Sequence, residues 1–468
     1  MKLTRIAAIV VLLHTFCVYL TTAQWCSQRS PRCCEGRDDH CTVPYKGIKC
    51  YCDIFCNHTV SDCCPDFWPL CLGVDPPEQK DCFHDGVGYR EGAVIRVNCN
   101  KCTCKNTQGD FAFNCENNAC AIRPELMTAV NRADYGWQAR NYTGLWGMTL
   151  RDAIKYRLGT LQADRTVSQM TEIDMDYNEA EIPDYFDARQ KWPGLVHDVM
   201  DQGNCGSSWA FSTVGVASDR LAIQSMGDMT MMLSPQHLIS CNSRRQRGCE
   251  GGHLDRAWWF MRKKGVVSYD CYPYTSGISD RKGYCLIGGK YGNYCPAGRH
   301  ENNGMYHSSP PYRISAKEKD IQHELMINGP LQASFEVKED FFMYNKGVYR
   351  HTREAAADGP QYHQSGWHSV KIIGWGTEYS PNGRPLKYWL CANSWGSKWG
   401  EDGYFKIIRG ENECNIESFV LGVWGRMQGV RARPAANVIR QRHNRFRRAT
   451  DTADGGLSNG WYDWLFGA

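Results

Sequence analysis

The sequence has no apolar run after residue 20 that is long enough to cross a membrane, and it carries little net charge. Its 54 Lys and Arg residues nearly balance 50 Asp and Glu residues, which leaves a formal charge of +4. The charged fraction of 22% and the apolar fraction of 42% are ordinary for globular proteins. This composition excludes wholesale disorder and a polytopic membrane protein. The length of 468 residues predicts roughly two to four folded domains.

The N-terminal residues predict export. Lys2 and Arg5 precede an apolar run at residues 6–20, and small residues follow, as in a cleavable signal peptide at residues 1–23. The run is shorter than the roughly 20 residues that span a bilayer, and an uncleaved signal anchor is the alternative. The 25 cysteines also favour an oxidising compartment. We therefore expect a secreted, disulfide-bonded protein with no membrane span and no nucleic-acid partner. Two asparagines lie in sequons that an exported chain can use for N-glycosylation: Asn57 and Asn141.

Ten cysteines lie between residues 26 and 71, a segment too short to be stable without disulfides. Their spacing, with adjacent pairs at 33–34 and 63–64, resembles a somatomedin-B module at residues 24–73. Modules of that family typically bind other proteins. They usually have eight cysteines, so we predict no pairing for the ten found here.

Six further cysteines resemble a von Willebrand factor type C module at residues 78–122. The spacing of Cys99, Cys102 and Cys104 also suits tetrahedral zinc coordination. Disulfides are favoured in an oxidising compartment, so we predict no metal site. Removal of the signal peptide would leave an even number of cysteines, which permits complete pairing.

Residues 123–181 form a cysteine-free stretch between these modules and the rest of the chain. Four apolar residues spaced as on one helix face predict a helix at 148–161: Leu150, Ile154, Leu158 and Leu161. Six carboxylates between residues 172 and 184 predict a solvated acidic linker. Its start mimics an EF-hand loop but lacks the glycine at the sixth position, so we reject calcium binding.

Residues 202–212 resemble the active-site motif of papain-like cysteine proteases, in which a cysteine begins a long buried helix. Ser208 stands at the position of that nucleophilic cysteine, and apolar residues continue after it at helical spacing. The resemblance implies roles for the neighbouring motifs. Gln202 would complete an oxyanion hole, His368 would be the base, and Asn393 would orient the imidazole. Trp395 would shield that pair, and Gly251 and Gly252 would line a peptide-binding cleft.

The local match is greatest with cathepsin B. Residues 182–189 resemble the start of its mature chain, and residues 137–144 resemble its propeptide. The resemblance implies an α+β fold over residues 182–425, with a helical lobe and a β-barrel-like lobe, preceded by the small disulfide-rich modules. The adjacent histidines of the cathepsin B occluding loop are absent between Cys271 and Cys295. Six cysteines of this domain are disulfide candidates: Cys205, Cys241, Cys249, Cys271, Cys285 and Cys295.

A serine at position 208 changes the chemistry of the site. In the cysteine enzymes a helix dipole and an imidazolium lower the thiol pKa from roughly 8.5 to between about 3 and 4. A hydroxyl starts with a much higher pKa than a thiol, so a comparable decrease leaves its pKa far above that of histidine. Serine proteases instead transfer the proton during attack and stabilise the imidazolium with an acid, whereas Asn393 is neutral. Loss of the nucleophile costs about 10⁶-fold in rate.

We therefore expect no active catalytic residue and no cofactor, and we interpret the site as a degenerate protease centre. Two alternatives stay open. One is a weakly active serine-nucleophile endopeptidase of papain type. The other is a decoy or regulator that holds peptides in the cleft without cutting them.

The combination of modules resembles the tubulointerstitial nephritis antigen family. That resemblance implies a secreted, non-proteolytic glycoprotein of basement membrane or extracellular matrix that acts in cell adhesion. It also implies matrix partners of laminin or collagen type and receptors such as integrins. No Arg-Gly-Asp tripeptide occurs, and no dibasic site lies between residues 137 and 185, so we expect the propeptide-like segment to stay attached.

Residues 426–468 predict a basic, disordered tail. The part at 426–448 has eight arginines and no acid, and subtracting its charge of +8 and the two signal charges from +4 leaves −6 elsewhere. A solvated tail is one interpretation, and adhesion to sulfated glycans is the other. Residues 445–448 also resemble a furin-type cleavage sequence. The candidate anion-binding residues are Arg440, Arg442, Arg445, Arg447 and Arg448.

Overall fold

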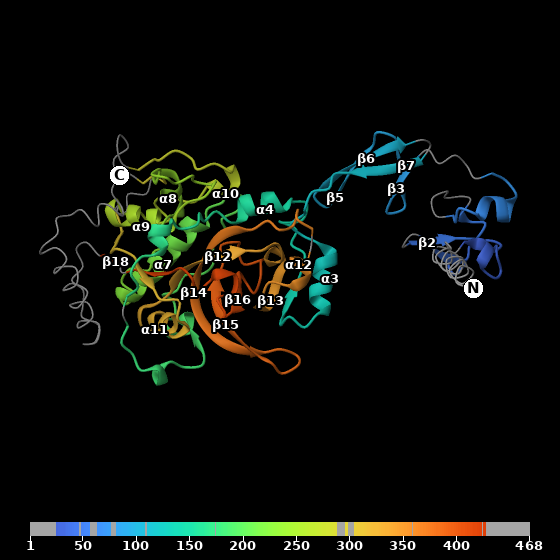
Figure 1. Cartoon of the computed structure of the whole chain (residues 1–468). Coiled ribbons are helices and arrows are strands. Elements are labelled where there is room, and N and C mark those ends of the chain that lie inside the picture. Colours follow the sequence, from blue (N-terminus) through green and yellow to red (C-terminus); the bar gives the residue numbers. More distant parts are fainter. Residues whose placement is uncertain are drawn as a thin grey trace, which may run out of the picture. The chain divides into compact units, whose positions relative to one another are not determined.

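The computed structural model divides the chain into two compact units, Met1–Asn117 and Asn118–Ala468 (Figure 1). The residues that it describes are 25–45, 48–56, 63–75, 81–107, 110–173, 175–287, 295–297, 304–357, 359–423 and 425–426. The signal peptide, Asn57 and the five candidate arginines of the tail lie outside these residues. No helix in the described part of the chain combines the length and the apolar character that a membrane crossing requires.

The first unit contains two regions of short elements. At residues 25–75, buried cystines and Phe67 form the core, as expected where too little apolar surface is available. Its ten cysteines form five disulfides: Cys26–Cys52, Cys33–Cys71, Cys34–Cys41, Cys50–Cys64 and Cys56–Cys63. The elements of this region are η2 (Cys26–Gln28), β1 (Thr42–Tyr45), β2 (Ile48–Tyr51) and η3 (Trp68–Leu72).

The second region of this unit consists of two small antiparallel sheets, β3-β4 and β5-β6-β7. Disulfides join Cys82 to Cys104 and Cys102 to Cys115, and Cys99 is also disulfide-bonded. No thiolate therefore remains at the Cys99–Cys104 cluster, which removes the ligands that the zinc alternative requires. The strands are β3 (Asp81–His84), β4 (Val87–Arg90), β5 (Val94–Val97), β6 (Asn100–Thr107) and β7 (Asp110–Cys115).

The second unit is built on a nine-stranded sheet with the order β11-β17-β12-β14-β15-β16-β13-β8, in which β9 also pairs with β14. Its strands are rich in buried aromatic and aliphatic side chains, which form a large core. Strands β10 and β18 pair separately. The strands are β8 (Trp137–Ala139), β9 (Phe186–Asp187), β10 (His307–Ser308), β11 (Tyr312–Ile314), β12 (Leu331–Val337), β13 (Tyr344–Tyr349), β14 (Gly366–Tyr379), β15 (Pro385–Ala392), β16 (Tyr404–Ile408), β17 (Val420–Gly422) and β18 (Gly425–Arg426).

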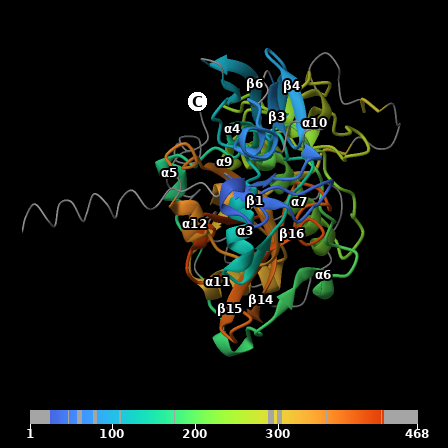
Figure 2. The same ribbon diagram turned by 90° about the vertical axis from the view of Figure 1, so that its right-hand side faces the viewer.

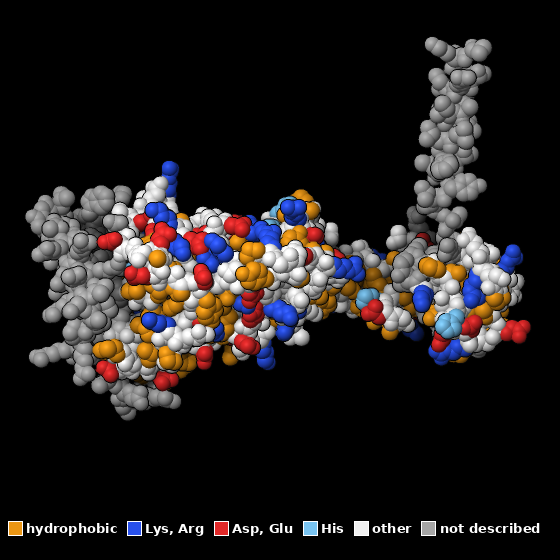
Figure 3. All heavy atoms as spheres, turned by 90° about the horizontal axis from the view of Figure 1, so that it is seen from below, with side chains coloured by type: hydrophobic (Ala, Val, Ile, Leu, Met, Phe, Trp, Pro, Cys, Tyr) orange, Lys and Arg blue, Asp and Glu red, His pale blue; other side chains and the backbone are white. Residues whose placement is uncertain are grey.

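A second core surrounds α7 (Ser208–Gln224), which lies with α8 and α9 on one side of this unit, while the long strands occupy the other (Figure 1). In Figure 2, β14 and β15 extend to the end of this unit that is away from α9. The expected helix after Ser208 is confirmed, and it is buried on nearly every side. On the face shown in Figure 3, acidic and basic side chains lie interspersed over this unit. The other helices and turns are α3 (Pro124–Arg132), α4 (Leu150–Arg157), α5 (Arg165–Ser168), η4 (Glu179–Glu181), α6 (Ala188–Lys191), α8 (Pro235–Cys241), α9 (Leu254–Lys263), α10 (Ser276–Ser279), α11 (Glu318–Asn328), η6 (Glu339–Met343), α12 (Arg353–Ala356) and η7 (Glu413–Asn415).

The propeptide-like segment differs from its predicted structure. The helix expected to reach residue 161 ends at Arg157, so Leu158 and Leu161 follow it in extended chain. Gly159 has φ +112°, a conformation that L-residues rarely adopt and that stops a helix. The hydrophobic spacing alone did not indicate this end.

The acidic stretch is also not a free linker. The Ile173 amide donates to the Arg313 carbonyl at 3.0 Å, and Glu172 pairs with the Arg313 side chain at 3.2 Å. Tyr177 stacks on His323 with ring centroids 4.5 Å apart. These contacts attach the stretch to the larger unit. The prediction of a solvated linker considered only the carboxylates and not the apolar and aromatic residues between them.

Candidate functional site

Ser208 is the first residue of α7 and is fully buried. Its hydroxyl lies 2.9 Å from the hydroxyl of Thr160, and it accepts a hydrogen bond from the Ser369 amide at 3.4 Å. Among the described residues no hydrogen bond joins the Ser208 hydroxyl to His368. The sequence did not single out Thr160, because a lone threonine in the propeptide-like segment has no motif around it.

His368 and Asn393 form the pair that the sequence motifs indicate. They lie on β14 and directly after β15, and His368 Nε2 is 2.7 Å from Asn393 Oδ1. Complete burial lowers the His368 pKa to about 4, although the bond to Asn393 acts in the opposite direction. The neutral imidazole therefore donates its Nε2 proton to Asn393. Its Nδ1 has no hydrogen-bond partner among the described residues, and Trp395 covers the ring at a centroid distance of 5.2 Å.

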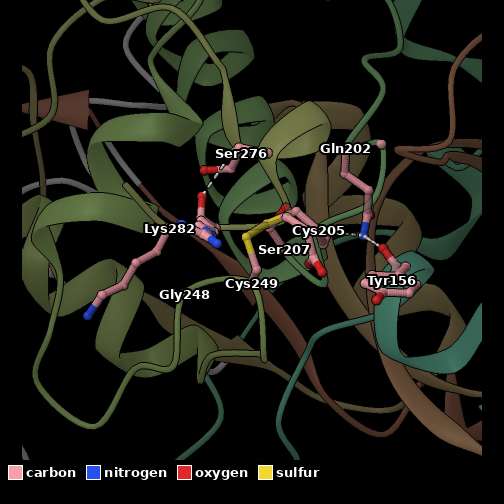
Figure 4. The surroundings of a disulfide bond; sticks show 12 residues. Tyr156, Gln202, Cys205, Ser207, Gly248, Cys249, Ser276 and Lys282 are labelled. Atoms are coloured by element: carbon pink, nitrogen blue, oxygen red, sulfur yellow. Dashed lines mark hydrogen bonds between the residues drawn. A yellow bond between two sulfur atoms is a disulfide. The ribbon is translucent and has the colours of Figure 1, made fainter. Parts of the chain in front are cut away.

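The two donors that were expected to form an oxyanion hole both bind one carbonyl of the chain itself. The Leu158 carbonyl accepts from Gln202 Nε2 at 3.0 Å and from the Ser208 amide at 3.3 Å. The Gln202 amide group also donates to the carbonyls of Tyr156 and Cys205, and Figure 4 shows its side chain directed at Tyr156. Both donors that would stabilise a tetrahedral intermediate are therefore occupied by the chain itself.

The backbone of Gly251 and Gly252, which we call the glycine wall, is occupied in the same way. Gly252 donates to the Gly159 carbonyl and accepts from the Leu161 amide, both at 2.9 Å. On the other side, the Thr160 amide donates to the Trp367 carbonyl at 3.1 Å. A Cβ on Gly251 would lie 3.1 Å from the Gly159 carbonyl oxygen. Residues 158–161 therefore lie along the expected peptide-binding cleft, and a foreign peptide could bind beside Gly251 and Gly252 only if these residues left it.

Gly159 allows this close approach. A Cβ there would lie 2.0 Å from the carbonyl carbon and oxygen of Gly206, which no side chain can tolerate. The sequence carried one signal for this position, a glycine near the end of the helical pattern, which can mark a helix end.

Three disulfides hold the loops around the site: Cys205–Cys249, Cys241–Cys285 and Cys271–Cys295. The first joins the start of α7 to the glycine wall (Figure 4). All six candidate cysteines are thus paired. Cys391 and Cys414 are free thiols, so the even number of cysteines did not lead to complete pairing.

Asn141 of the second predicted glycosylation sequon is exposed, whereas the adjacent Tyr142 is buried and donates its hydroxyl proton to the Tyr344 carbonyl. The asparagine side chain is therefore accessible while its neighbour anchors the segment.

Comparison with known proteins identifies the relatives of this architecture. The family model described as papain family cysteine protease matches residues 182–424. The tubulointerstitial nephritis antigen-like protein of Mus musculus is 49% identical over 414 residues, which are 86% of this chain and 88% of that protein. The tubulointerstitial nephritis antigen of Homo sapiens is 43% identical over 422 residues, 86% of this chain and 87% of that protein.

A solved structure of proCathepsin B S9 from Trypanosoma congolense is 30% identical, with a TM-score of 0.55, over 66% of this chain and 100% of that one. The predicted α+β, papain-like fold with its two lobes is confirmed. The chain therefore belongs to the tubulointerstitial nephritis antigen family and carries a papain-family, cathepsin B-like domain.

Proposed function

We propose that the protein is a secreted, non-catalytic glycoprotein of extracellular matrix or basement membrane that acts in matrix binding and cell adhesion. The observation that carries this proposal is the site itself. Ser208 stands where the resemblance places the nucleophilic cysteine, and residues 158–161 of the same chain bind Gln202, the Ser208 amide and Gly252. A site in this state offers no room for a substrate and no nucleophile suited to its histidine.

The chemistry of proton transfer supports the loss of catalysis. Attack by the Ser208 hydroxyl would require His368 to accept the proton and become a buried imidazolium. At a pKa of about 4, protonating that ring at pH 7 costs on the order of 4 kcal/mol. Serine proteases offset this cost with a carboxylate, whereas the partner of His368 is the neutral amide of Asn393.

One observation favours the second candidate, a weakly active serine-nucleophile endopeptidase. The unpartnered Nδ1 of His368 is a free acceptor inside the site. Activity would need residues 158–161 to leave the cleft and the Ser208 hydroxyl to turn from Thr160 toward that nitrogen. A decoy that captures foreign peptides would need the same departure, so the filled cleft counts against it equally.

Secretion is supported by the signal-like N-terminus and by disulfides in both units. The matrix partners that we propose are proteins of laminin or collagen type and cell-surface receptors such as integrins. The arginine-rich tail offers a further contact with sulfated glycans through multidentate hydrogen bonds.

Matrix binding should be independent of residue 208. We expect the full glycosylated chain to bind immobilised laminin or type IV collagen and to support integrin-dependent cell attachment. Ser208→Ala should bind equally well, because Ser208 is buried in the larger unit. Solid-phase binding and attachment assays measure both properties. Binding no greater than that of albumin, or its loss in Ser208→Ala, would contradict the proposal.

A further inference from the structure

Two basic segments of the helical lobe lie together at its surface. The first, at residues 244–247, contains Arg244, Arg245 and Arg247, and the second contains Arg281 and Lys282. No acidic residue occurs between Cys241 and Cys249 or between residues 281 and 287. We call residues 244–247 and 281–282 the basic loop pair.

Covalent and polar contacts hold the two segments against each other. The Cys241–Cys285 disulfide brings their ends together with a Cα–Cα distance of 4.7 Å. The Lys282 carbonyl accepts from Gln236 Nε2 at 3.2 Å. A Cβ on Gly248 would lie 2.6 Å from the Cβ of Lys282, so the Lys282 side chain packs directly on the Gly248 backbone. Figure 4 shows Lys282 beside Gly248, with its side chain extending away from the Cys205–Cys249 disulfide.

A buried glutamine fixes how the first segment presents its arginines. Gln246 accepts from the His253 amide at 2.7 Å and donates to the His253 carbonyl at 3.0 Å. The flanking Arg245 and Arg247 are exposed, and Arg245 adopts the left-handed conformation with φ +53°. The backbone that carries both arginines is thus fixed before any ligand binds.

The cations of the basic loop pair have few partners within the protein. Arg244 lies over the Trp259 ring at 5.2 Å. Asp280, the acid beside the second segment, faces Lys155 at 3.8 Å, and Glu250 is exposed. Within the described ranges, no ion pair involves the following exposed residues: Arg245, Arg247, Arg281 and Lys282. A fixed group of unpaired like charges creates a positive potential that attracts a polyanion.

We propose that the basic loop pair binds a sulfated glycosaminoglycan chain. Guanidinium groups match sulfate as they match phosphate, by paired hydrogen bonds that a lysine cannot make. The disulfide and Gln246 hold the backbone in advance, which lowers the ordering cost of binding. An acidic protein would supply similar charge, and the test below distinguishes it from the glycan. This site is separate from the tail, and it does not depend on the loss of catalysis.

The test uses the full-length chain, with the tail contribution reduced by alanine at its five candidate arginines. On this background, Arg245→Ala, Arg247→Ala and Lys282→Ala are combined. A control set removes the same charge from exposed residues elsewhere in the larger unit: Lys346→Ala, Arg384→Ala and Lys398→Ala. Binding to immobilised, size-defined heparin is measured by surface plasmon resonance at several salt concentrations.

We expect the basic-loop variant to bind heparin about tenfold more weakly, as three exposed charge contacts together imply. Its affinity should also depend less steeply on salt, and the control set should change affinity less than twofold. An unchanged affinity, or an equal loss in the control set, would overturn the proposal. Displacement of the protein by polyaspartate as readily as by soluble heparin would also overturn it, in favour of an acidic protein partner.

Discussion

Restoring the nucleophile alone, with Ser208→Cys in the full chain, is expected to give no turnover of dibasic fluorogenic peptides at pH 7. The reason is steric and electrostatic. The Leu158 carbonyl occupies both oxyanion donors, and the filled, buried site holds the His368 pKa at about 4, which disfavours a thiolate–imidazolium pair. A second substitution, Gly159→Val, should release the site, because its Cβ would lie 2.0 Å from the Gly206 carbonyl.

The double variant Ser208→Cys, Gly159→Val should therefore have a kcat/KM at least about 10³-fold higher than that of Ser208→Cys alone. This is part of the roughly 10⁶-fold that a nucleophile contributes. A matched control is Ser208→Cys with Gly144→Val, since a Cβ on Gly144 would approach no heavy atom closer than Arg157 Nη2 at 3.9 Å. That control should stay inactive. Full activity in Ser208→Cys alone would show that residues 158–161 do not block the cleft. Inactivity of the double variant would show that the site lacks more than its nucleophile.

The largest expected effect on stability follows from Arg220, which joins α7 to the sheet. Its side chain is completely buried and donates to Glu324 at 3.1 Å, to the Tyr312 hydroxyl at 2.7 Å and to the Pro330 carbonyl at 2.8 Å. Arg220→Ala should lower the free energy of unfolding by about 3–5 kcal/mol, because the Glu324 charge stays buried without its cation.

Thermal unfolding followed by fluorescence measures this loss. Arg220→Lys should recover only part of it, since an ammonium group cannot reproduce the fork of guanidinium donors. The control is Arg350→Ala. Arg350 and Glu411 form an ion pair whose side chains are 28% and 56% exposed, so its loss should cost less than about 1 kcal/mol. Equal effects at Arg220 and Arg350 would contradict the structural role of the buried network.

The sequence was sufficient for the fold class, and its motifs named residues that the structure brings close together. Gln202, His368 and Asn393 each stand in a motif, and five motifs in order are specific even though their members are far apart in the chain. The contacts of residues 158–161 could not be predicted in the same way. The helical spacing of Leu150, Ile154 and Leu158 continued into Leu161, whereas the helix ends at Arg157 and the backbone of Leu158 and Gly159 is not helical.

The number of cysteines was also insufficient to predict which of them form disulfides. An even count permits complete pairing but does not require it, because a pair forms only where two Cα atoms lie close enough. Cys391 is fully buried in β15 and Cys414 lies in η7, and both are free. Their sequence neighbours carry no sign of this, since spatial distance is set by the fold of the whole unit.

We expect the native chain to have no proteolytic activity of its own. The direct measurement compares turnover of dibasic fluorogenic peptides by the purified wild-type chain and by Ser208→Ala, with a mock purification as background. Both proteins should match the background at every pH tested. Turnover by the wild type that Ser208→Ala abolishes, and that the mock purification lacks, would contradict it.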